Sequence, residues 1–296
     1  MFTSFGSLNW IAPFGLVFLL ATFASWWLSR LRAIDSKLDP SHIDLALPLA
    51  FLLGIAGAGM LSLLVPMDVH MTGEMMQTDL RIRLFGILVS GSAVVYAYSR
   101  TAKLSFRQLL DVFAVPAVLW LVIHRLGCFL AGCCWGDISV FDSELAAQAH
   151  THLGMQVQTL PWLAGDWIVT GVQYPPGSMP FEQQVLMGLI AADASASLPV
   201  HPVQLYEAAA LAVLFLFMRR VPLDRYPLGT IAVTVASAYA VLRFLVEFLR
   251  ADGNIVIGML TMTQLQSIAL IAISYPTLLL YRRRYGDASA LRTLHS

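Results

Sequence analysis

Charged side chains are scarce in this sequence, and their scarcity argues against a soluble fold. Asp, Glu, Lys and Arg make up 12% of the residues, against about 25% in an average soluble domain. Hydrophobic residues make up 58%, and the mean hydropathy is +0.71. These values predict an integral membrane protein. The net charge of zero gives no reason to expect a nucleic-acid partner.

A cleavable signal peptide is not evident either. The first apolar run is long, lacks a basic start and is followed by Arg30 and Arg32, which is not the pattern of a cleaved leader. We therefore expect a first transmembrane helix with its N-terminus outside. No internal repeat or low-complexity tract is visible.

Seven apolar runs approach the ~20 residues that a helix needs to cross a bilayer. The third run is short, and the fifth carries Glu207 near its start. The sequence therefore predicts an all-α integral membrane protein with seven transmembrane helices. The runs cover residues 8–28, 44–66, 84–98, 111–130, 202–218, 227–249 and 260–281.

The basic residues alternate between the loops. Thirteen of the 18 follow the first, third, fifth and seventh runs, and the positive-inside rule assigns such loops to the cytoplasm. The N-terminus is then outside and the C-terminus inside, which agrees with an odd number of spans. The thirteen are Arg30, Arg32, Lys37, Arg100, Lys103, Arg107, Arg219, Arg220, Arg225, Arg282, Arg283, Arg284 and Arg292.

Residues 137–199 form the one large segment on the outer side. They contain no Lys or Arg but six acidic residues, and Pro, Gly and Trp punctuate them. This composition predicts a small folded cap, with a loosely ordered loop as the alternative. The chain then divides into helices one to four (1–136), the cap (137–199), and helices five to seven with a cytoplasmic tail (200–296).

Five basic residues remain on the disfavoured outer side: Arg81, Arg83, Arg125, Arg243 and Arg250. A charge inside a membrane segment costs about 2.5–3.5 kcal/mol on insertion scales, so such residues tend to mark a site. Their retention suggests that they bind an anionic group.

Arg243, Glu247 and Arg250 have the spacing i, i+4 and i+7, which places them on one helical stripe. One carboxylate between two guanidiniums leaves a net positive face. Arginine presents a planar donor that can clamp a phosphate with two hydrogen bonds. The alternative is a structural Arg–Glu pair between helices.

All three cysteines lie in residues 124–136. His124 and Cys128 are four apart, and such a pair can form a thiolate nucleophile. Cys133 and Cys134 are adjacent; this is not a CxxC pair, so we expect no metal site. A disulfide from Cys128 to either neighbour stays open because the outer face is oxidising. So does the simple packing of small thiols at a helix end.

His201-Pro-Val-Gln-Leu-Tyr-Glu207 opens the fifth run. Proline suits the first helical turn, where its missing N–H costs nothing. Gln204 and Glu207 are three apart and share a helix face. The alternative is an interfacial belt of polar and aromatic groups without chemistry.

These motifs together resemble the bacterial prolipoprotein diacylglyceryl transferases. The match is carried by residues 125–136 (RLGCFLAGCCWG), 201–207 (HPVQLYE), 242–250 (LRFLVEFLR) and 262–267 (MTQLQS). The family consists of seven-span plasma-membrane enzymes that move a diacylglyceryl group from phosphatidylglycerol to a lipobox cysteine of a prolipoprotein. The resemblance implies a multi-pass protein of the bacterial inner membrane, with that lipid and the prolipoprotein signal peptide as partners and no cofactor.

The resemblance also implies roles for individual residues. His124 or His201 would be the base for the incoming thiol. Arg125, Arg243 and Arg250 would act on the leaving phosphate, with Glu247 orienting the guanidiniums. The phospholipid-binding residues would be Arg125, Gly127, Cys128, Gly136, Gln204, Tyr206, Glu207, Arg243 and Arg250.

The sequence departs from the family pattern at polar positions. Where the family has Gly-Asn-Phe-x-Asn-Gly-Glu, this chain has Cys128, Ala131 and Cys133 for the two Asn and the Glu. The family's histidine before a glycine in the third span corresponds to Phe85, and a tyrosine of the first span to Phe14. Two further hypotheses follow: a paralogue with another acceptor or a Cys128 thioester, and a non-catalytic lipid-binding protein.

The topology can be tested with fusions. A reporter that is active only outside should be silent after Arg284 and active near Gly154, because the basic loops fix the orientation. Reporter activity in whole cells is the measurement, and the reverse pattern would refute the orientation.

Overall fold

The computed structural model describes residues 11–64, 89–138, 171–250, 255–258 and 260–293. The chain forms two compact units. Unit 1 comprises Met1–Ala24, Ala117–Arg220 and Val233–Ser296, and unit 2 comprises Ser25–Pro116 and Val221–Ala232. The boundaries between the units fall inside helices, after Ala24, Pro116 and Ala232.

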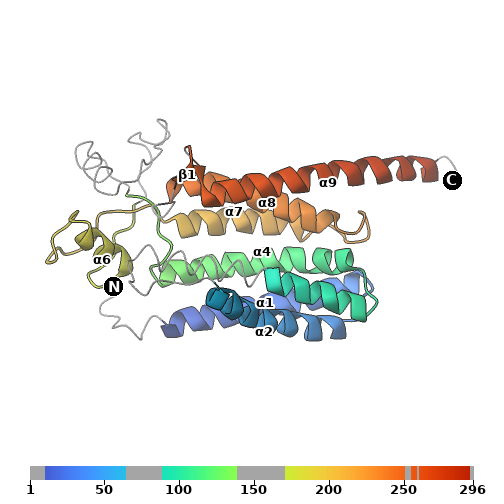
Figure 1. Cartoon of the computed structure of the whole chain (residues 1–296), viewed down its shortest axis with the longest axis horizontal. Coiled ribbons are helices and arrows are strands. Elements are labelled where there is room, and N and C mark those ends of the chain that lie inside the picture. The colour runs from blue at the N-terminus through green and yellow to red at the C-terminus, as the bar shows by residue number, and fades with distance from the viewer. Residues whose placement is uncertain (1–10, 65–88, 139–170, 251–254, 259, 294–296) are drawn as a thin grey trace. The chain divides into compact units, whose positions relative to one another are not determined.

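Helices make up almost all of the described structure (Figure 1). One helix covers residues 89–101. The only strands among the described residues form an antiparallel hairpin, β1 (Ile255–Ile257) and β2 (Leu260–Thr261). The main helices are α1 (Ile11–Asp35), α2 (Ser41–Leu64), α4 (Phe106–Leu130), α6 (Met179–Leu186), α7 (Val203–Met218), α8 (Thr230–Val246), the short 3-10 helix η1 (Glu247–Leu249) and α9 (Met262–Thr293).

Four of these helices contain segments long and apolar enough to cross a membrane: Phe14–Asp35, Phe106–Leu130, Thr230–Leu249 and Met262–Leu280. Two shorter apolar segments, Ser41–Gly57 and Val203–Met218, accompany them. The all-helical, membrane-embedded class expected from composition agrees with these segments. The full set of seven spans stays a prediction.

In unit 2 the first helix continues beyond the predicted end at residue 28. The apolar run stops there, but α1 reaches Asp35 because polar partners accommodate its charges. Arg30 Nη1 lies 3.2 Å from Asp44 Oδ2, and Trp26 Nε1 donates to the same carboxylate at 2.9 Å. The predicted run ended at residue 28 and left Arg30 in the following loop; that boundary was wrong, because α1 includes Arg30.

Asp111 is the buried anchor of unit 2. Its carboxylate accepts the backbone N–H of Gly229 at 2.6 Å and of Ala232 at 2.8 Å. These are among the N–H groups that the first turn of α8 leaves without a helical partner. The buried Arg32 interacts with the same carboxylate electrostatically. Asp111 therefore fixes where α8 begins.

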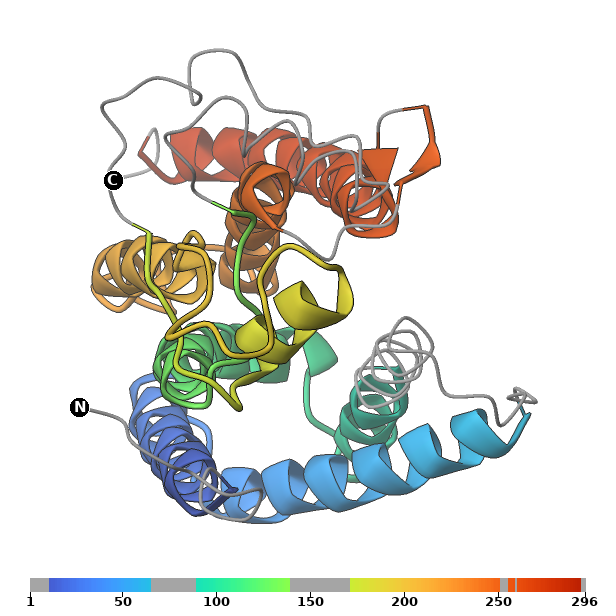
Figure 2. The same cartoon turned by 90° about the vertical axis from the view of Figure 1, so that its left-hand side faces the viewer.

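In unit 1, α7, α8 and α9 run side by side in both views (Figures 1 and 2). Ser237 on α8 donates to Ser274 on α9 at 2.7 Å. A close approach also occurs at Gly127 on α4, where a Cβ would lie 2.9 Å from Val17 Cγ1 of α1. A larger residue there would force α1 and α4 apart.

The described part of the predicted cap, residues 171–199, is folded. It contains α6, and Val172 pairs with Val200 through N–H···O bonds of 2.9 and 3.1 Å. The side chain of Gln184 accepts the N–H of Leu198 at 2.7 Å, which ties α6 to the return segment. Residues 139–170 lie outside the described residues.

Replacing Asp111 should destabilise unit 2. Asp111→Ala leaves the N–H groups of Gly229 and Ala232 without their acceptor and removes one of the two carboxylates, Asp35 and Asp111, that act on Arg32. We therefore expect a loss of about 3 kcal/mol in unfolding free energy. The measurement is thermal unfolding in detergent. Asp224→Ala, at an exposed acidic residue of the same unit, is the control. Equal melting temperatures of the two variants would contradict the anchoring role.

Candidate active site at the helix ends of unit 1

A short backbone segment joins the three motifs that carry the family resemblance. The N–H of Gly136 donates to the carbonyl of His201 at 2.9 Å, and the N–H of Asp137 donates to the carbonyl of Leu249 at 2.9 Å. His201 N–H in turn donates to the carbonyl of Asp137 at 2.9 Å. The ends of α4 and α8 and the start of α7 therefore meet at residues 136–137.

Gly136 is required for this junction. A Cβ at this position would clash with Val203 Cγ2 and lie 2.6 Å from the carbonyl oxygen of Leu249 and 2.7 Å from that of His201. Because two of these contacts are with backbone, the neighbours cannot move aside easily. Gly136 thus permits the close approach of these backbone segments. This role explains the glycine in the motif without a direct contact to lipid.

Five charged side chains form an alternating chain of ion pairs at this junction. Arg125 Nε lies 2.7 Å from Glu207 Oε2, and Arg243 Nη1 lies 3.3 Å from Glu207 Oε1. Arg243 Nη2 lies 2.8 Å from Glu247 Oε2, and Arg250 Nε lies 3.9 Å from the same oxygen. We call Arg125, Glu207, Arg243, Glu247 and Arg250 the ion chain.

The two carboxylates of the ion chain are almost completely buried, with side-chain exposures of 2% for Glu207 and 1% for Glu247. Three guanidiniums face these two carboxylates, so the ion chain carries one surplus positive charge. The helical spacing predicted the pairing of Glu247 with Arg243. The bridge from Glu207 to arginines on α4 and α8 is tertiary, and no sequence spacing indicates it. The structure contains both the pairing between helices and the positive surplus.

Thr261 and Gln264 support the ion chain and were missed as site residues. Thr261 Oγ1 donates to Glu247 Oε1 at 3.0 Å. The N–H of Gln264 donates to Thr261 Oγ1 at 3.2 Å, and the N–H of Thr261 donates to Gln264 Oε1 at 3.0 Å. This reciprocal pair is a capping box at the start of α9. The spacing Thr-x-x-Gln was the available signal, and it fixes α9 against Glu247.

Gln204 and His201 position the backbone around the site. Gln204 Nε2 donates to the carbonyl of Cys133 at 2.6 Å, and Gln204 shares its helix face with Glu207 as expected. The His201 ring centroid lies 6.3 Å from that of Tyr206. Burial lowers the pKa of His201 and so favours the neutral form of its imidazole. Its main visible contact is through its backbone.

His124 lies against the cysteines, on the side that its spacing predicts. Its Nδ1 is 3.6 Å from Cys128 Sγ. The imidazole stacks on Trp120 with 4.7 Å between centroids and an interplanar angle of 15°, while Phe14 meets it edge-on at 5.8 Å. Phe14, one of the departures from the family pattern, therefore packs edge-on against the His124 ring. Unlike the tyrosine of the family pattern, it has no hydroxyl group that could form a hydrogen bond.

The cysteines come together through the end of α4. The N–H of Cys133 donates to the carbonyl of Cys128 at 3.1 Å, and the N–H of Gly132 donates to that of Phe129 at 3.1 Å. This is a Schellman motif, with Gly132 at a φ of +65°. Cys134 has a φ of +59°, which costs a non-glycine residue about 1–2 kcal/mol.

The three sulfurs lie within 4.8 Å of one another. None of the three cysteines forms a disulfide in the structure. Hydrogen bonds with the thiols of Cys128 and Cys133 hold the pKa of Cys134 below its usual range, and Arg250 and Arg125 act in the same direction. The corresponding hydrogen bonds raise the pKa of Cys133.

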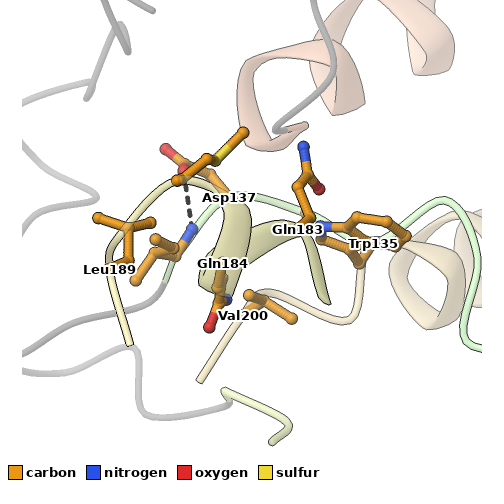
Figure 3. Close-up of a pocket in the computed structure, with 9 residues that line it drawn as sticks. Trp135, Asp137, Gln183, Gln184, Leu189 and Val200 are labelled. Atoms are coloured by element: carbon orange, nitrogen blue, oxygen red, sulfur yellow. Dashed lines mark hydrogen bonds between the residues drawn. The ribbon is translucent and has the colours of Figure 1, made fainter. Parts of the chain in front are cut away.

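A small pocket lies between the segment after the cysteines and α6 (Figure 3). Asp137 accepts the N–H of Ile138 at 2.7 Å at its wall. The residues that line it include no arginine, so it is separate from the ion chain. They are Trp135, Gly136, Asp137, Ile138, Gln183, Gln184, Met187, Leu189 and Val200.

Of the predicted site residues, Arg125, Glu207, Arg243, Glu247 and Arg250 come together directly. His124 and Cys128 adjoin Arg125 on α4, while Gly136, His201 and Gln204 hold the surrounding backbone. Arg81, Arg83 and the departure at Phe85 lie outside the described residues.

Comparison with known proteins agrees with the motifs. The family model described as "Prolipoprotein diacylglyceryl transferase" matches residues 2–280. A phosphatidylglycerol–prolipoprotein diacylglyceryl transferase of Xanthomonas campestris pv. campestris (strain B100) is 28% identical over 290 residues, covering 91% of this chain and 87% of that protein. One from Nitratidesulfovibrio vulgaris (strain DSM 19637 / Miyazaki F) is 27% identical over 291 residues, covering 94% and 92%. The chain therefore belongs to the prolipoprotein diacylglyceryl transferase family.

Proposed function

We propose that this protein transfers a diacylglyceryl group from phosphatidylglycerol to the cysteine thiol of a prolipoprotein lipobox. The observation that carries the proposal is the ion chain, whose surplus positive charge lies where the three family motifs meet. The relatives that match are named for this reaction. The anionic phosphate of the lipid is the natural counter-charge for the surplus.

The arginines suit a leaving phosphate. In the reaction the glyceryl C–O bond breaks, an S–C bond forms, and glycerol phosphate leaves with an added negative charge. Cations that are already in place stabilise such developing charge without reorganising. Glu207 and Glu247 contact Arg125 and Arg250 through Nε, and a guanidinium held there has further N–H donors for phosphate oxygens. The carboxylates therefore orient the donors.

The incoming thiol needs a base, and we assign that role to His124. Its ring is held by Trp120 and Phe14, with one nitrogen 3.6 Å from Cys128 Sγ and with Arg125 next in the chain. Histidine exchanges a proton near neutral pH without a large pKa shift. His201 is the second candidate, although its visible contacts are structural. A covalent route through Cys128 is less well supported because that residue is only 2% exposed.

We propose seven spans in the bacterial plasma membrane, with the ion chain near the outer face. The support is the distribution of charge. Arg30 and Arg32 lie in the last turns of α1, Arg100 at the end of the helix over residues 89–101, and Arg107 in the first turn of α4, whereas residues 137–199 carry no basic residue. The folded segment 171–199 would then be an outer cap over the site.

A transfer assay with labelled phosphatidylglycerol and a lipobox peptide tests the function and the arginines together. Arg243→Lys retains the charge but loses the planar fork that bridges Glu207 and Glu247, so turnover should fall by about 10-fold or more while expression is maintained. Arg220→Lys, at an exposed arginine in the turn after α7, is the matched control. Wild-type protein without transfer would refute the function. Normal turnover in both single variants, Arg243→Lys and Arg125→Ala, would refute the role of these arginines at the phosphate.

The base can be assigned with two glutamine variants in the same assay. His124→Gln should reduce turnover by about 10²-fold, the usual scale for removing a positioned base. His201→Gln should have the smaller effect, because the backbone N–H and C=O that hold Gly136 and Asp137 remain. Loss of turnover in His201→Gln with full activity in His124→Gln would assign the base to His201 instead.

A further inference from the structure

Among the described residues of unit 1, the three cysteines form a reactive cluster that the proposed chemistry does not use. Cys128, Cys133 and Cys134 are all the cysteines of the chain, and their sulfurs gather within 4.8 Å. Their sequence spacing argued against a metal, because it contains no CxxC pair. The folded arrangement calls for a different interpretation.

We propose that Cys128, Cys133 and Cys134 together bind one thiophilic metal ion of the zinc type as thiolates and leave a fourth coordination position open. Three protein ligands with one open position is the arrangement of zinc sites that act on an exogenous ligand, whereas structural zinc sites have four protein ligands.

The geometry is close to that of a loaded site. Zinc–sulfur bonds of about 2.3 Å at tetrahedral angles place the sulfurs about 3.8 Å apart. The sulfurs in the structure are within 4.8 Å, so rotations of the thiol side chains would close the difference. The sulfurs are not joined in a disulfide, and each can supply one ligand.

The turn explains how adjacent cysteines can both serve. Neighbouring side chains in an extended chain point to opposite faces, which is why Cys133 and Cys134 are poor partners by spacing alone. The left-handed conformation of Cys134, with a φ of +59°, turns the chain at this point. The Schellman motif has already folded Cys133 back over Cys128. Two unusual backbone conformations thus converge on one arrangement of sulfurs.

Charge and access also favour the site. Arg125 of the ion chain lies three residues before Cys128 on α4, so positive charge adjoins the cluster. Three thiolates around a divalent ion carry a net charge of −1, next to an ion chain with a surplus of +1. Cys128 is buried, whereas Cys133 and Cys134 are partly exposed, so a metal ion can reach the cluster from their side.

The fourth position is open among the described residues, since no other His, Cys, Asp or Glu ligand atom belongs to the same 4.8 Å group. His124 touches only the edge of the cluster, at Cys128. The role of this position rests on the proposed function: the acceptor cysteine coordinates there and loses its thiol proton to His124. Its sulfur then forms the S–C bond as the glyceryl C–O bond breaks, and the phosphate keeps the electron pair. Metal coordination deprotonates a thiol outright.

The metal site is tested on the full-length protein in detergent, purified under reducing conditions and without added chelator. We expect about one zinc per chain by elemental analysis, in line with a single three-thiolate site. Replacing zinc with Co²⁺ should give a thiolate-to-cobalt charge-transfer band. Cys128→Ser, Cys133→Ser and Cys134→Ser should each lose most of the metal, while Ala131→Ser, which adds a hydroxyl within the same turn and removes no sulfur, should retain it.

Two results would overturn the metal site. The first is a metal content in wild type no higher than in the triple serine variant, even after incubation with Zn²⁺. The second is a disulfide between two of the cysteines under these conditions, shown by mass spectrometry of unreduced peptides. Because both readouts are independent of lipid transfer, they stand whether or not the proposed function holds.

The role of the open position is tested separately with the cobalt-loaded protein. A lipobox peptide with its cysteine should change the charge-transfer band, and the same peptide with serine should not, because only a fourth thiolate adds to the band. An unchanged band with a protein that transfers lipid would refute thiol binding at the metal. A changed band with a protein that transfers no lipid would refute the proposed function and leave the metal site intact.

Discussion

The burial of two carboxylates, Glu207 and Glu247, is the constraint on which the site depends. An isolated buried charge costs several kcal/mol, so each carboxylate must be paired with good geometry. The partners come from different helices: Arg125 from α4 and Arg243 from α8. Thr261, at the start of α9, completes the set through Glu247. The positions of four helix ends therefore follow from satisfying two side chains, and the backbone bonds at Gly136 and Asp137 fix the same ends.

The same arrangement leaves the site with a net positive charge that can attract an anion. A buried ion pair adds little net free energy of folding, and an unpaired buried charge costs more. Stability alone would therefore favour equal numbers of carboxylates and guanidiniums. The ion chain instead keeps one guanidinium more than its carboxylates neutralise. A protein that places such a surplus among apolar helices accepts a cost in stability that a bound anion removes. This is the pattern expected at a functional site, where pre-arranged charge is aimed at a ligand.

Local periodicity accounts for much of what the sequence predicted. The apolar runs located the helices, and spacings of four residues correctly paired Arg243 with Glu247 and His124 with Cys128. The errors arose where distant residues decide. The end of α1 was set too early because Asp44, in the next helix, accommodates Arg30. The approach of the three sulfurs depends on the backbone conformation of Cys134 rather than on spacing, and the expectation of no metal site stays a prediction. The Glu207 bridge likewise required a tertiary contact between α4, α7 and α8.

The movement of charge during the proposed reaction links the sulfur cluster to the arginines. Before transfer, the negative charge is on the acceptor thiolate. Afterwards the sulfur is a neutral thioether, and the leaving phosphate has gained that charge. A catalyst gains most when it stabilises both locations without rearranging. Arg125 and Arg250 act on Cys134 electrostatically and also belong to the ion chain. One set of cations can thus lie next to the charge at the start and at the end of the reaction. In the proposed site, the cysteines that stand at polar positions of the family pattern would hold the thiolate, while the arginines would stabilise the leaving phosphate.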